Sequence, residues 1–440
     1  MDPVEKNGTH IRHLLRALRS RNYRLFVAGQ SVSLVGTWMQ QVAMSWLVYR
    51  LTGSAMLLGV VGFASQIPTI FISPVAGVLA DRWDRRRLLI ATQALAMFQA
   101  AFLAIVVLTG VVQVWQIILL SLILGVVNAF DIPVRQSFIV EMVEHREDLG
   151  NAIALNSSMV NGARLIGPAI AGLLVASVGE GICFILNAIS YLAVIVALAA
   201  MRIPHGSHHS RPRRHILHEL HEGFMYAYKF GPIRSILLLV ALVSLMGMPY
   251  AVLMPVFAKD ILHGGAHTFG FLMTAAGSGA LVGTLYLASR QSVLGLGRVI
   301  VTATIFFAAG IASFALSSNF ILSLAALTLA GFGAMTLVSS CNTVLQTILD
   351  EDKRGRVMSF FTMAFVGMAP FGSLGAGTMA GIIGPRDTLL IGGGGCLVGA
   401  AIFARQLPHI REKVRPIYVR MGIIQEVANG MESTAEQQPL

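Results

Sequence analysis

Apolar stretches of about twenty residues recur along the whole chain, and they restrict its fold more than any other feature. A helix of about twenty apolar residues is long enough to cross the hydrocarbon core of a bilayer. Only 12% of the 440 residues are charged, about half the share of roughly 25% in soluble domains. The sequence therefore predicts an all-α polytopic membrane protein rather than a soluble enzyme. We expect twelve helices, over residues 25–47, 56–80, 88–109, 114–134, 151–176, 182–201, 235–257, 269–288, 299–317, 320–346, 357–381 and 388–404.

Basic residues gather on one side of these predicted helices. When the loops are numbered in chain order, 27 of the 32 Lys and Arg residues lie in the N-terminal arm, the even-numbered loops and the C-terminal tail. Only three lie in the odd-numbered loops. Because cytoplasmic loops carry the excess of Lys and Arg, we expect an integral protein of the cytoplasmic membrane with both termini in the cytoplasm. The same loops account for the net charge of +11 without a nucleic-acid partner.

Part of the sequence repeats after a shift of 205 residues. The glycines that coincide under this shift are Gly167, Gly172 and Gly179 in the first copy and Gly372, Gly377 and Gly384 in the second. Repeated halves are typical of transporters that hold the substrate between the repeats near the bilayer midplane. We therefore expect two pseudo-symmetric six-helix halves, residues 25–201 and 232–404, with a cytoplasmic linker (202–231), an N-terminal arm (1–24) and a C-terminal tail (405–440).

The predicted loop after the second helix carries a motif that reads Gly77-Val78-Leu79-Ala80-Asp81-Arg82-Trp83-Asp84-Arg85-Arg86-Arg87. It resembles the Gly-x-Leu-Ala-Asp-Arg-x-Gly-Arg-Arg signature of the major facilitator superfamily, with Asp84 in place of the second glycine. Gly77 permits close approach of two helices, and Asp81 can accept hydrogen bonds from a helix N-terminus or pair with an arginine. A topological cluster of positive charge would explain the arginines but not Gly77 or Asp81. The resemblance implies a gate latch made of Gly77, Asp81, Arg82, Arg85 and Arg86.

The predicted fifth helix carries the segment Gly167-Pro168-Ala169-Ile170-Ala171-Gly172. It is similar to the Gly-x-x-x-Gly-Pro-x-x-Gly-Gly motif of antiporter branches of the superfamily, with alanines at two of the glycine positions. Small residues at this spacing let helix backbones approach closely, and proline bends the helix at a fixed place. Ordinary helix packing explains the same residues, and the link to export is what the resemblance adds.

Two further segments resemble one particular branch of the superfamily. Residues 125–136, which include Gly125, Asn128 and Asp131, and the segment 356–359 look like the enterobactin-exporter branch of the superfamily, which also contains macrolide-efflux relatives. The chain has Ser121 where other drug/proton antiporters carry an arginine, which puts their proton-relay arginine in doubt for this chain.

The resemblance implies a secondary transporter that exports a small amphipathic compound, siderophore-like or drug-like, by proton antiport with rocker-switch alternating access. A proton-coupled uptake symporter is one alternative. A non-transporting membrane receptor or assembly factor on the same fold is another. The expected partners are a small-molecule substrate, protons and the lipid bilayer, for a monomer that needs no cofactor or metal.

Charged residues inside the predicted helices are the candidates for coupling. A charge in the centre of a transmembrane helix is costly, so one that is present needs a reason. Asp131 and Arg135 are four residues apart and can pair on one helical face with Asn128. Arg164 lies deeper in its helix. The alternative is a structural ion pair between Asp131 and Arg135, with Arg164 bound to backbone carbonyls.

Polar residues at helical spacing are candidates for lining the substrate pathway, because polar side chains in a span face other helices or a wet cavity. These candidates are Ser33, Thr37 and Gln40 in the first helix, Asn128 in the fourth, and Thr336, Ser340 and Thr343 in the tenth. Hydrogen bonding between helices explains them equally well. The histidines of the linker are expected to be part of a solvated basic segment, because no Cys or acidic partners complete a metal site.

The predicted topology can be tested by labelling single cysteines introduced at Ser207 and at Lys259 in a variant without Cys183, Cys341 and Cys396. A membrane-impermeant thiol reagent applied to intact cells should label position 259 and leave position 207 unlabelled, because the linker is on the cytoplasmic side. Labelling of position 207 from outside would contradict the predicted topology.

Overall fold

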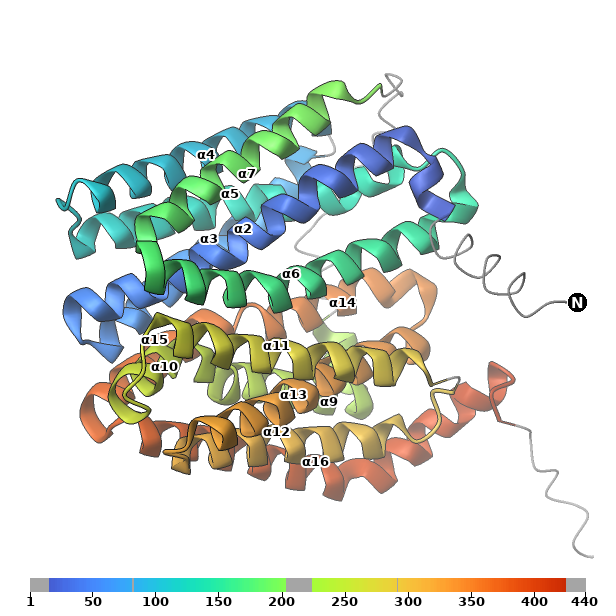
Figure 1. Cartoon of the computed structure of the whole chain (residues 1–440). Helices are drawn as coiled ribbons and strands as arrows, with labels where there is room; N and C mark the ends of the chain where they lie inside the picture. The colour runs from blue at the N-terminus through green and yellow to red at the C-terminus, as the bar shows by residue number, and fades with distance from the viewer. Residues whose placement is uncertain (1–15, 81–82, 203–223, 291, 425–440) are drawn as a thin grey trace, which may run out of the picture.

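The computed structural model describes residues 16–80, 83–202, 224–290 and 292–424, and these residues form a bundle of long helices (Figure 1). The first half consists of η1 (Arg16–Arg19), α2 (Arg21–Thr52), α3 (Ala55–Ala80), α4 (Arg85–Leu108), α5 (Val114–Met142), η2 (Arg146–Asp148), α6 (Leu149–Val178) and α7 (Glu180–Ala200). The second half consists of α9 (Gly231–Leu242), η3 (Val243–Gly247), α10 (Tyr250–Val256), η4 (Phe257–Ile261), α11 (Ala266–Ala288), α12 (Leu296–Leu316), α13 (Phe320–Ile348), α14 (Glu351–Phe365), α15 (Ala369–Ile383) and α16 (Pro385–Arg420).

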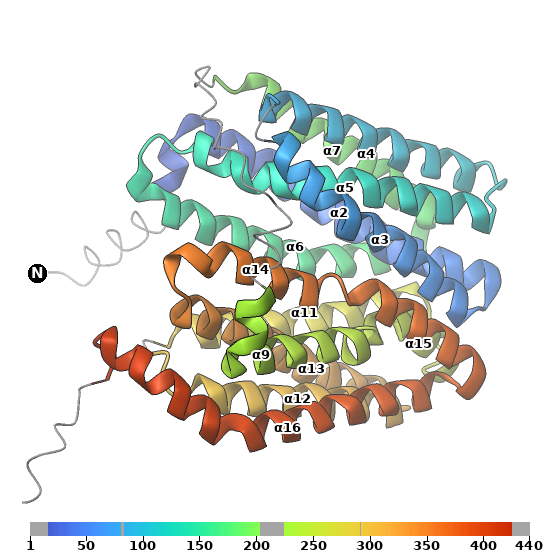
Figure 2. The same ribbon diagram turned by 180° about the vertical axis from the view of Figure 1, so that it is seen from behind.

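The two halves lie side by side, with the blue-to-green helices above the yellow-to-red helices in Figure 1. Within the first half α2 packs against α6 and α7, and α3 packs against α5. Within the second half α13 packs against α11 and α12, and α12 against α16. The described ends of the chain and of the linker lie at one end of the bundle, here called the terminal end (Figures 1 and 2). The opposite end, where α2 turns into α3 and α15 into α16, is called the loop end.

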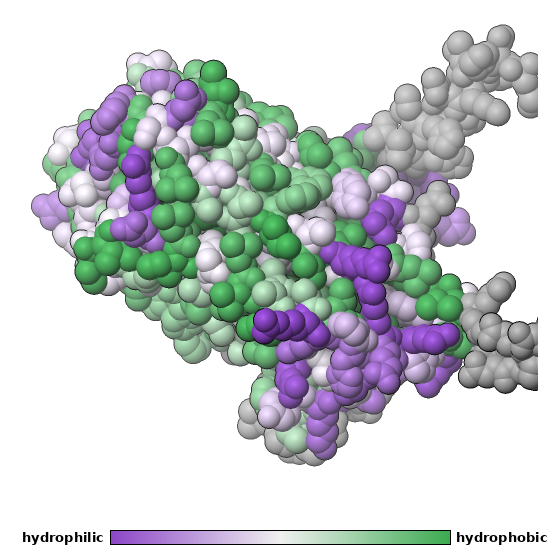
Figure 3. Space-filling view, turned by 90° about the horizontal axis from the view of Figure 1, so that it is seen from below, coloured by the Kyte–Doolittle hydropathy of each residue, from purple (hydrophilic) through white to green (hydrophobic). Residues whose placement is uncertain are grey.

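The surface of the bundle fits a bilayer. Figure 3 shows a broad apolar belt on one face, with hydrophilic residues gathered towards the two ends. Among the described residues, eleven helical segments are long and apolar enough to cross a membrane. The helix α2 is not one of the eleven, because it contains buried polar side chains such as Gln30 and Gln40, but it is 32 residues long and packs within the same bundle. The protein is therefore an integral all-α membrane protein, as the sequence predicts.

Two of the predicted helices are broken in the second half. The predicted helix 235–257 becomes α9 and α10 with a π-helical turn between them, and the predicted helix 357–381 becomes α14 and α15. Pro249 and Pro370 lie at the two breaks. The Ser244 hydroxyl near the first break donates a hydrogen bond to the carbonyl oxygen of Phe365 near the second, so this bond connects the two broken helices. Proline has no backbone N–H for the helical hydrogen bond, so it favours a break in the helix. Hydropathy does not record this effect, and it therefore does not reveal where these helices stop.

The last helix is longer than the sequence predicts. The apolar stretch ends near residue 404, but α16 continues to Arg420. Leu407, Ile410 and Val414 are buried at helical spacing, while charged residues occupy the other faces. An amphipathic extension of this kind lowers the mean hydropathy without ending the helix.

Paired glycines bring the two halves into backbone contact. A Cβ atom on Gly172 of α6 would lie 2.9 Å from the Cα of Gly270 in α11. A Cβ atom on Gly377 of α15 would lie 2.8 Å from the Cα of Gly59 in α3. Because Gly172 and Gly377 coincide under the 205-residue shift, the repeated glycines have the same structural task in the two halves. Both contacts lie towards the loop end.

We predict that Gly377→Val opens the loop end. The added side chain would overlap the backbone of α3, and overpacking of this kind costs about 1–3 kcal/mol, so a cysteine placed at the buried Ser373 should react about ten times faster with a thiol reagent in the purified protein. The matched control is Gly375→Val, because Gly375 lies on the same helix and a Cβ added there would meet no atom within 4 Å. Equal reaction rates in the two variants would contradict the prediction.

Candidate functional site

Aromatic and polar contacts close the space between the halves at the loop end. Trp46 of α2 stacks on Phe269 of α11 with ring centroids 6.4 Å apart, and Phe63 of α3 meets Phe371 of α15 at 5.9 Å. The Tyr49 hydroxyl at the end of α2 donates a hydrogen bond to the Asp260 carboxylate in η4. The Lys259 ammonium lies 5.5 Å from the Tyr49 ring centroid. These contacts join the two halves, so they must break if the loop end opens.

The close backbone approaches between α6 and α11 continue only part of the way towards the terminal end. The last of them joins Gly277 of α11 to Arg164 of α6, whose carbonyl oxygen is 3.1 Å from the position of a Cβ on Gly277. Beyond it, Ser157 and Ser158 of α6 and Thr362 and Met363 of α14 are exposed. The main packing between the described halves joins α3 to α15 and α6 to α11, and α14 takes no part in it, so the halves are closed at the loop end and separate towards the terminal end.

Arg164 lies where this packing ends. Gly167, one turn further along α6, brings the helix against α2, since a Cβ there would lie 2.6 Å from the Cβ of Trp38. This close approach places the Arg164 guanidinium 5.1 Å from the centroid of the Trp38 ring. The Arg164 Nε is buried, and no described residue accepts a hydrogen bond from it.

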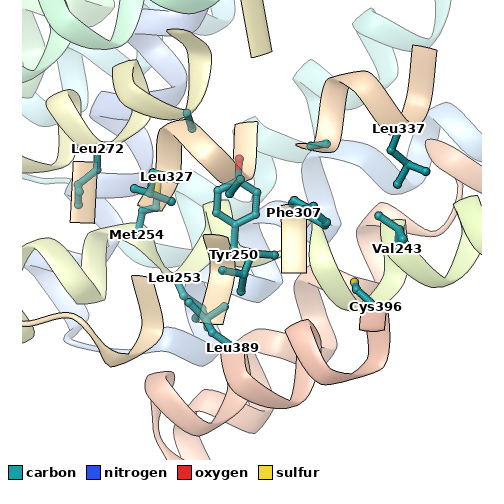
Figure 4. Packing of buried hydrophobic residues seen from close by; sticks show 14 of the residues in the cluster. Val243, Tyr250, Leu253, Met254, Leu272, Phe307, Leu327, Leu337, Leu389 and Cys396 are labelled. Atoms are coloured by element: carbon teal, nitrogen blue, oxygen red, sulfur yellow. The ribbon is translucent and has the colours of Figure 1, made fainter. Parts of the chain in front are cut away.

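Tyr250 belongs to the second half and is nearly fully buried there. Its ring meets Phe307 edge to face at 6.0 Å. Figure 4 shows this ring among buried apolar side chains, with Leu253 and Leu389 on the side away from the hydroxyl. The aromatic neighbour of Arg164 is Trp38 of α2, and Tyr250 belongs to the core of the second half.

The pair formed by Asp131 and Arg135 lies within the first half. The Arg135 Nε is 3.5 Å from Asp131 Oδ2, and Asp131 is only 5% exposed. The Thr92 hydroxyl and the Gln93 side-chain amide of α4 donate hydrogen bonds to Asp131 Oδ1, at 3.0 and 2.7 Å. All these partners belong to α4 and α5, so the geometry favours the structural alternative, in which the carboxylate holds α4 against α5.

The polar residues of α2 also face the interior of the first half. The Gln40 amide donates to Gln99 of α4 at 3.0 Å, and Asn187 of α7 donates to Gln40 at 2.7 Å. Ser33 is buried, and the Thr37 hydroxyl donates to the Ser33 carbonyl. For Gln40 this placement favours the alternative of hydrogen bonding between helices, because its partners lie on α4 and α7. For Ser33 and Thr37, lining of the pathway stays a prediction.

The remaining pathway candidates lie in different surroundings. Thr336 and Ser340 of α13 are buried, with hydroxyl groups that have no described partner, and a Cβ on Gly283 of α11 would lie 2.7 Å from the Thr336 hydroxyl. Thr336 is therefore packed within the second half against α11. The Thr343 hydroxyl donates to the Ser339 carbonyl of its own helix, and Asn128 is partly exposed on α5.

The predicted gate latch is only partly within the described residues. Asp81 and Arg82 lie outside them, and Gly77 lies in the last turn of α3. Arg85 forms an ion pair with Glu141 of α5 at 2.5 Å. Arg86 donates to the carbonyl oxygens of Leu198 and Ala199, which end α7. Both arginines thus tie the start of α4 to neighbouring helices of the first half.

Several residues of the site were missed by the sequence analysis. Trp38 and the Tyr49–Asp260 pair come from helices far apart in the chain, and aromatic residues are common in transmembrane helices, so no local pattern distinguishes them. Arg164 carries a signal of its own, since it is a charge within an apolar stretch.

The structure has two helical halves that meet through glycines, with a charged residue between them and access from one end. These features are typical of secondary transporters with repeated domains. The family described as transmembrane secretion effector matches residues 14–419. The chain belongs to this family of the major facilitator superfamily, in its efflux branch, and is a transporter rather than an enzyme.

Curated relatives agree with this assignment. The chain is 26% identical over 377 residues to the staphyloferrin A transporter of Staphylococcus aureus (strain NCTC 8325 / PS 47), covering 84% of this chain and 92% of that protein. It is 27% identical over 399 residues to the multidrug efflux pump Tap of Mycobacterium tuberculosis (strain ATCC 25618 / H37Rv), covering 88% and 91%. It is 24% identical over 261 residues to macrolide efflux protein A of Streptococcus pyogenes, covering 59% and 64%.

Solved structures share the fold. A bacterial homologue of the human lysosomal transporter Spinster, in an inward-facing and unoccupied conformation, matches with a TM-score of 0.71 at 15% identity, covering 90% of this chain and 98% of that chain. The nucleoside transporter NupG matches with a TM-score of 0.65 at 14% identity, covering 88% of this chain and 98% of that chain.

We predict that Asp131→Ala lowers the stability of the protein by about 1–3 kcal/mol, because Thr92, Gln93 and Arg135 lose a buried acceptor. Asp131→Asn keeps an acceptor oxygen and should lose less. Melting of the purified variants measures both effects. The control is Glu412→Ala, since the Glu412 side chain is 80% exposed.

The same variants separate the structural role from proton coupling. If the role of Asp131 is structural, the Asp131→Asn variant should still transport substrate when a pH gradient is imposed. If Asp131→Asn melts like the wild type and its transport no longer responds to pH, the carboxylate carries the proton and the structural assignment is wrong.

Proposed function

We propose that the protein exports a small amphipathic compound, siderophore-like or drug-like, across the cytoplasmic membrane by proton antiport with rocker-switch alternating access. The observation that carries this proposal is the interface between the halves, in which backbone contacts between glycines close one end while the other end remains accessible. Two such halves can exchange the closed end for the open end without unfolding, which is the movement that alternating access needs.

The orientation follows from the charges. The terminal end carries the excess of Lys and Arg, so we place it in the cytoplasm of an inner membrane. The described conformation is then open to the cytoplasm, the state in which an exporter collects its substrate. The names of the relatives, which include a siderophore transporter and two kinds of drug efflux protein, support export and an amphipathic substrate.

Everted membrane vesicles test the proposal. Vesicles that contain the protein should accumulate a hydrophobic fluorescent dye when a pH gradient, acidic inside, is imposed, and a protonophore should abolish the accumulation. Vesicles from cells without the protein are the control. Movement of the dye in the opposite direction would indicate the uptake symporter, and a lack of gradient-driven movement for a panel of amphipathic dyes would favour a receptor.

We further predict that Asp81→Asn abolishes most of this transport while expression and membrane insertion remain nearly normal. A charge-assisted hydrogen bond contributes about 1.5–3 kcal/mol, which is enough to shift a balance between two states ten- to hundredfold. Dye accumulation in everted vesicles measures the effect.

The matched control for the latch is Asp84→Asn in the same loop. Asp84 accepts a hydrogen bond from the backbone N–H of Arg87 at the start of α4, and asparagine caps a helix equally well. Transport should therefore be retained in this variant. Full activity of Asp81→Asn would contradict the latch assignment.

A further inference from the structure

We propose that Arg164 and Trp38 form a binding site for an organic anion, and that the substrate of this transporter carries a carboxylate on an aromatic or apolar body. This inference rests on the proposed function, because it names the substrate class of the same pathway. It starts from the guanidinium of Arg164, which lies between the halves where their close packing ends.

Three other arginines in the helices of the first half have polar partners. Arg50 donates to both oxygens of Glu180 at 2.7 and 3.2 Å, Arg135 pairs with Asp131, and Arg86 donates to carbonyl oxygens at the end of α7. For Arg164, by contrast, no described residue supplies a carboxylate or accepts a hydrogen bond from the buried Nε. A charge at membrane depth that the fold does not neutralise marks a place where a ligand of opposite charge can bind.

The internal repeat argues against a structural need for this charge. The 205-residue shift that superimposes Gly167 on Gly372 places Arg164 over Ala369 in the second half. Both halves use the glycines of this region for backbone contact. Only the first half has an arginine, so the charge is not a requirement of the shared helix packing.

The surroundings of Arg164 define the rest of the ligand. A guanidinium presents a planar fork of N–H donors that binds both oxygens of a carboxylate. The Trp38 ring next to it offers a flat apolar face. The site therefore suits an anion with an aromatic body.

The position of the site connects it to the transport cycle. Arg164 and Trp38 belong to the first half, and the Arg164 backbone lies against Gly277 of the second half, so a ligand held there lies at the interface between the halves. Exposed Ser157 and Ser158 of the same helix lie between Arg164 and the terminal end. A ligand from the cytoplasm would reach Arg164 in the described conformation.

Binding of a matched pair of probes tests the proposal. The purified protein in phosphatidylcholine nanodiscs is titrated with 2-naphthoate and with its uncharged amide, 2-naphthamide. The wild type should bind 2-naphthoate at least tenfold more tightly, since a hydrogen bond to a charged group is worth more than a neutral one. Arg164→Gln should reduce the affinity for 2-naphthoate to that for 2-naphthamide. Trp38→Leu should weaken the binding of both ligands, because it removes the aromatic face.

The control variant is Arg386→Gln, which removes one positive charge at the loop end, where Arg386 donates to Ser318. It should bind both probes like the wild type. If Arg164→Gln does not fold, Arg164→Lys replaces it: lysine keeps the charge without the fork, so 2-naphthoate should bind several times more weakly and 2-naphthamide equally well. Equal affinities of the wild type for the two probes, or an unchanged preference in either Arg164 variant, would overturn the proposal.

Two further arms separate the alternatives. In nanodiscs with about one third phosphatidylglycerol, the protein should retain the Arg164-dependent preference for 2-naphthoate. Loss of this preference would assign the site to an anionic lipid headgroup instead. Binding of 2-naphthoate without dye transport in vesicles would overturn the proposed function and leave this site intact. Dye transport by a protein without the preference for 2-naphthoate would overturn the site and leave the function intact.

Discussion

The contact between glycine backbones of the two halves is the constraint on which the rest of the structure depends. Helices in a bilayer gain little from hydrophobic burial against each other, so they associate through close packing and hydrogen bonds. Gly172 with Gly270, and Gly59 with Gly377, allow this packing at two crossing points near the loop end. Because each crossing joins one helix from each half, it can separate while both halves keep their own cores. The same contact therefore holds the molecule together and allows it to move.

Polar side chains inside the bundle fall into two groups. Asp131 with Thr92 and Gln93, and Gln40 with Gln99 and Asn187, are satisfied by helices of their own half. These networks make each half rigid, because a buried polar group that loses its partner is costly. Arg164 belongs to the second group: it lies between the halves and has an aromatic neighbour in place of a carboxylate.

Hydropathy and charge were sufficient to predict the class of the fold, because the bilayer requires long apolar helices and a biased distribution of basic residues. The repeated glycines also predicted equivalent positions in the halves, since only glycine permits such close backbones. The breaks beside Pro249 and Pro370 and the extension of α16 were not predicted, because they depend on hydrogen bonds and packing between distant segments.

The candidate site was predictable only in part. The charge of Arg164 is visible in the sequence, but its neighbour Trp38 comes from another helix. For Ser33, Thr37 and Gln40 the helical spacing correctly indicates one shared face, but it does not indicate which neighbours that face meets. In the structure the neighbours of Gln40 are α4 and α7, so this residue belongs to the interior of the first half.

The central claim is that the halves move as units, so that one end closes when the other opens. Distances between spin labels at both ends of the protein in nanodiscs test it most directly. One pair is placed at Leu51 and Asp387 at the loop end, and the other at Ser158 and Thr362 towards the terminal end, all of them exposed. As the pH is varied, the populations at short and long distance should change in opposite directions at the two ends, while a pair within the first half, at Leu51 and Val111, keeps one distance. Distances that change together at both ends, or a changing distance within the first half, would contradict the account.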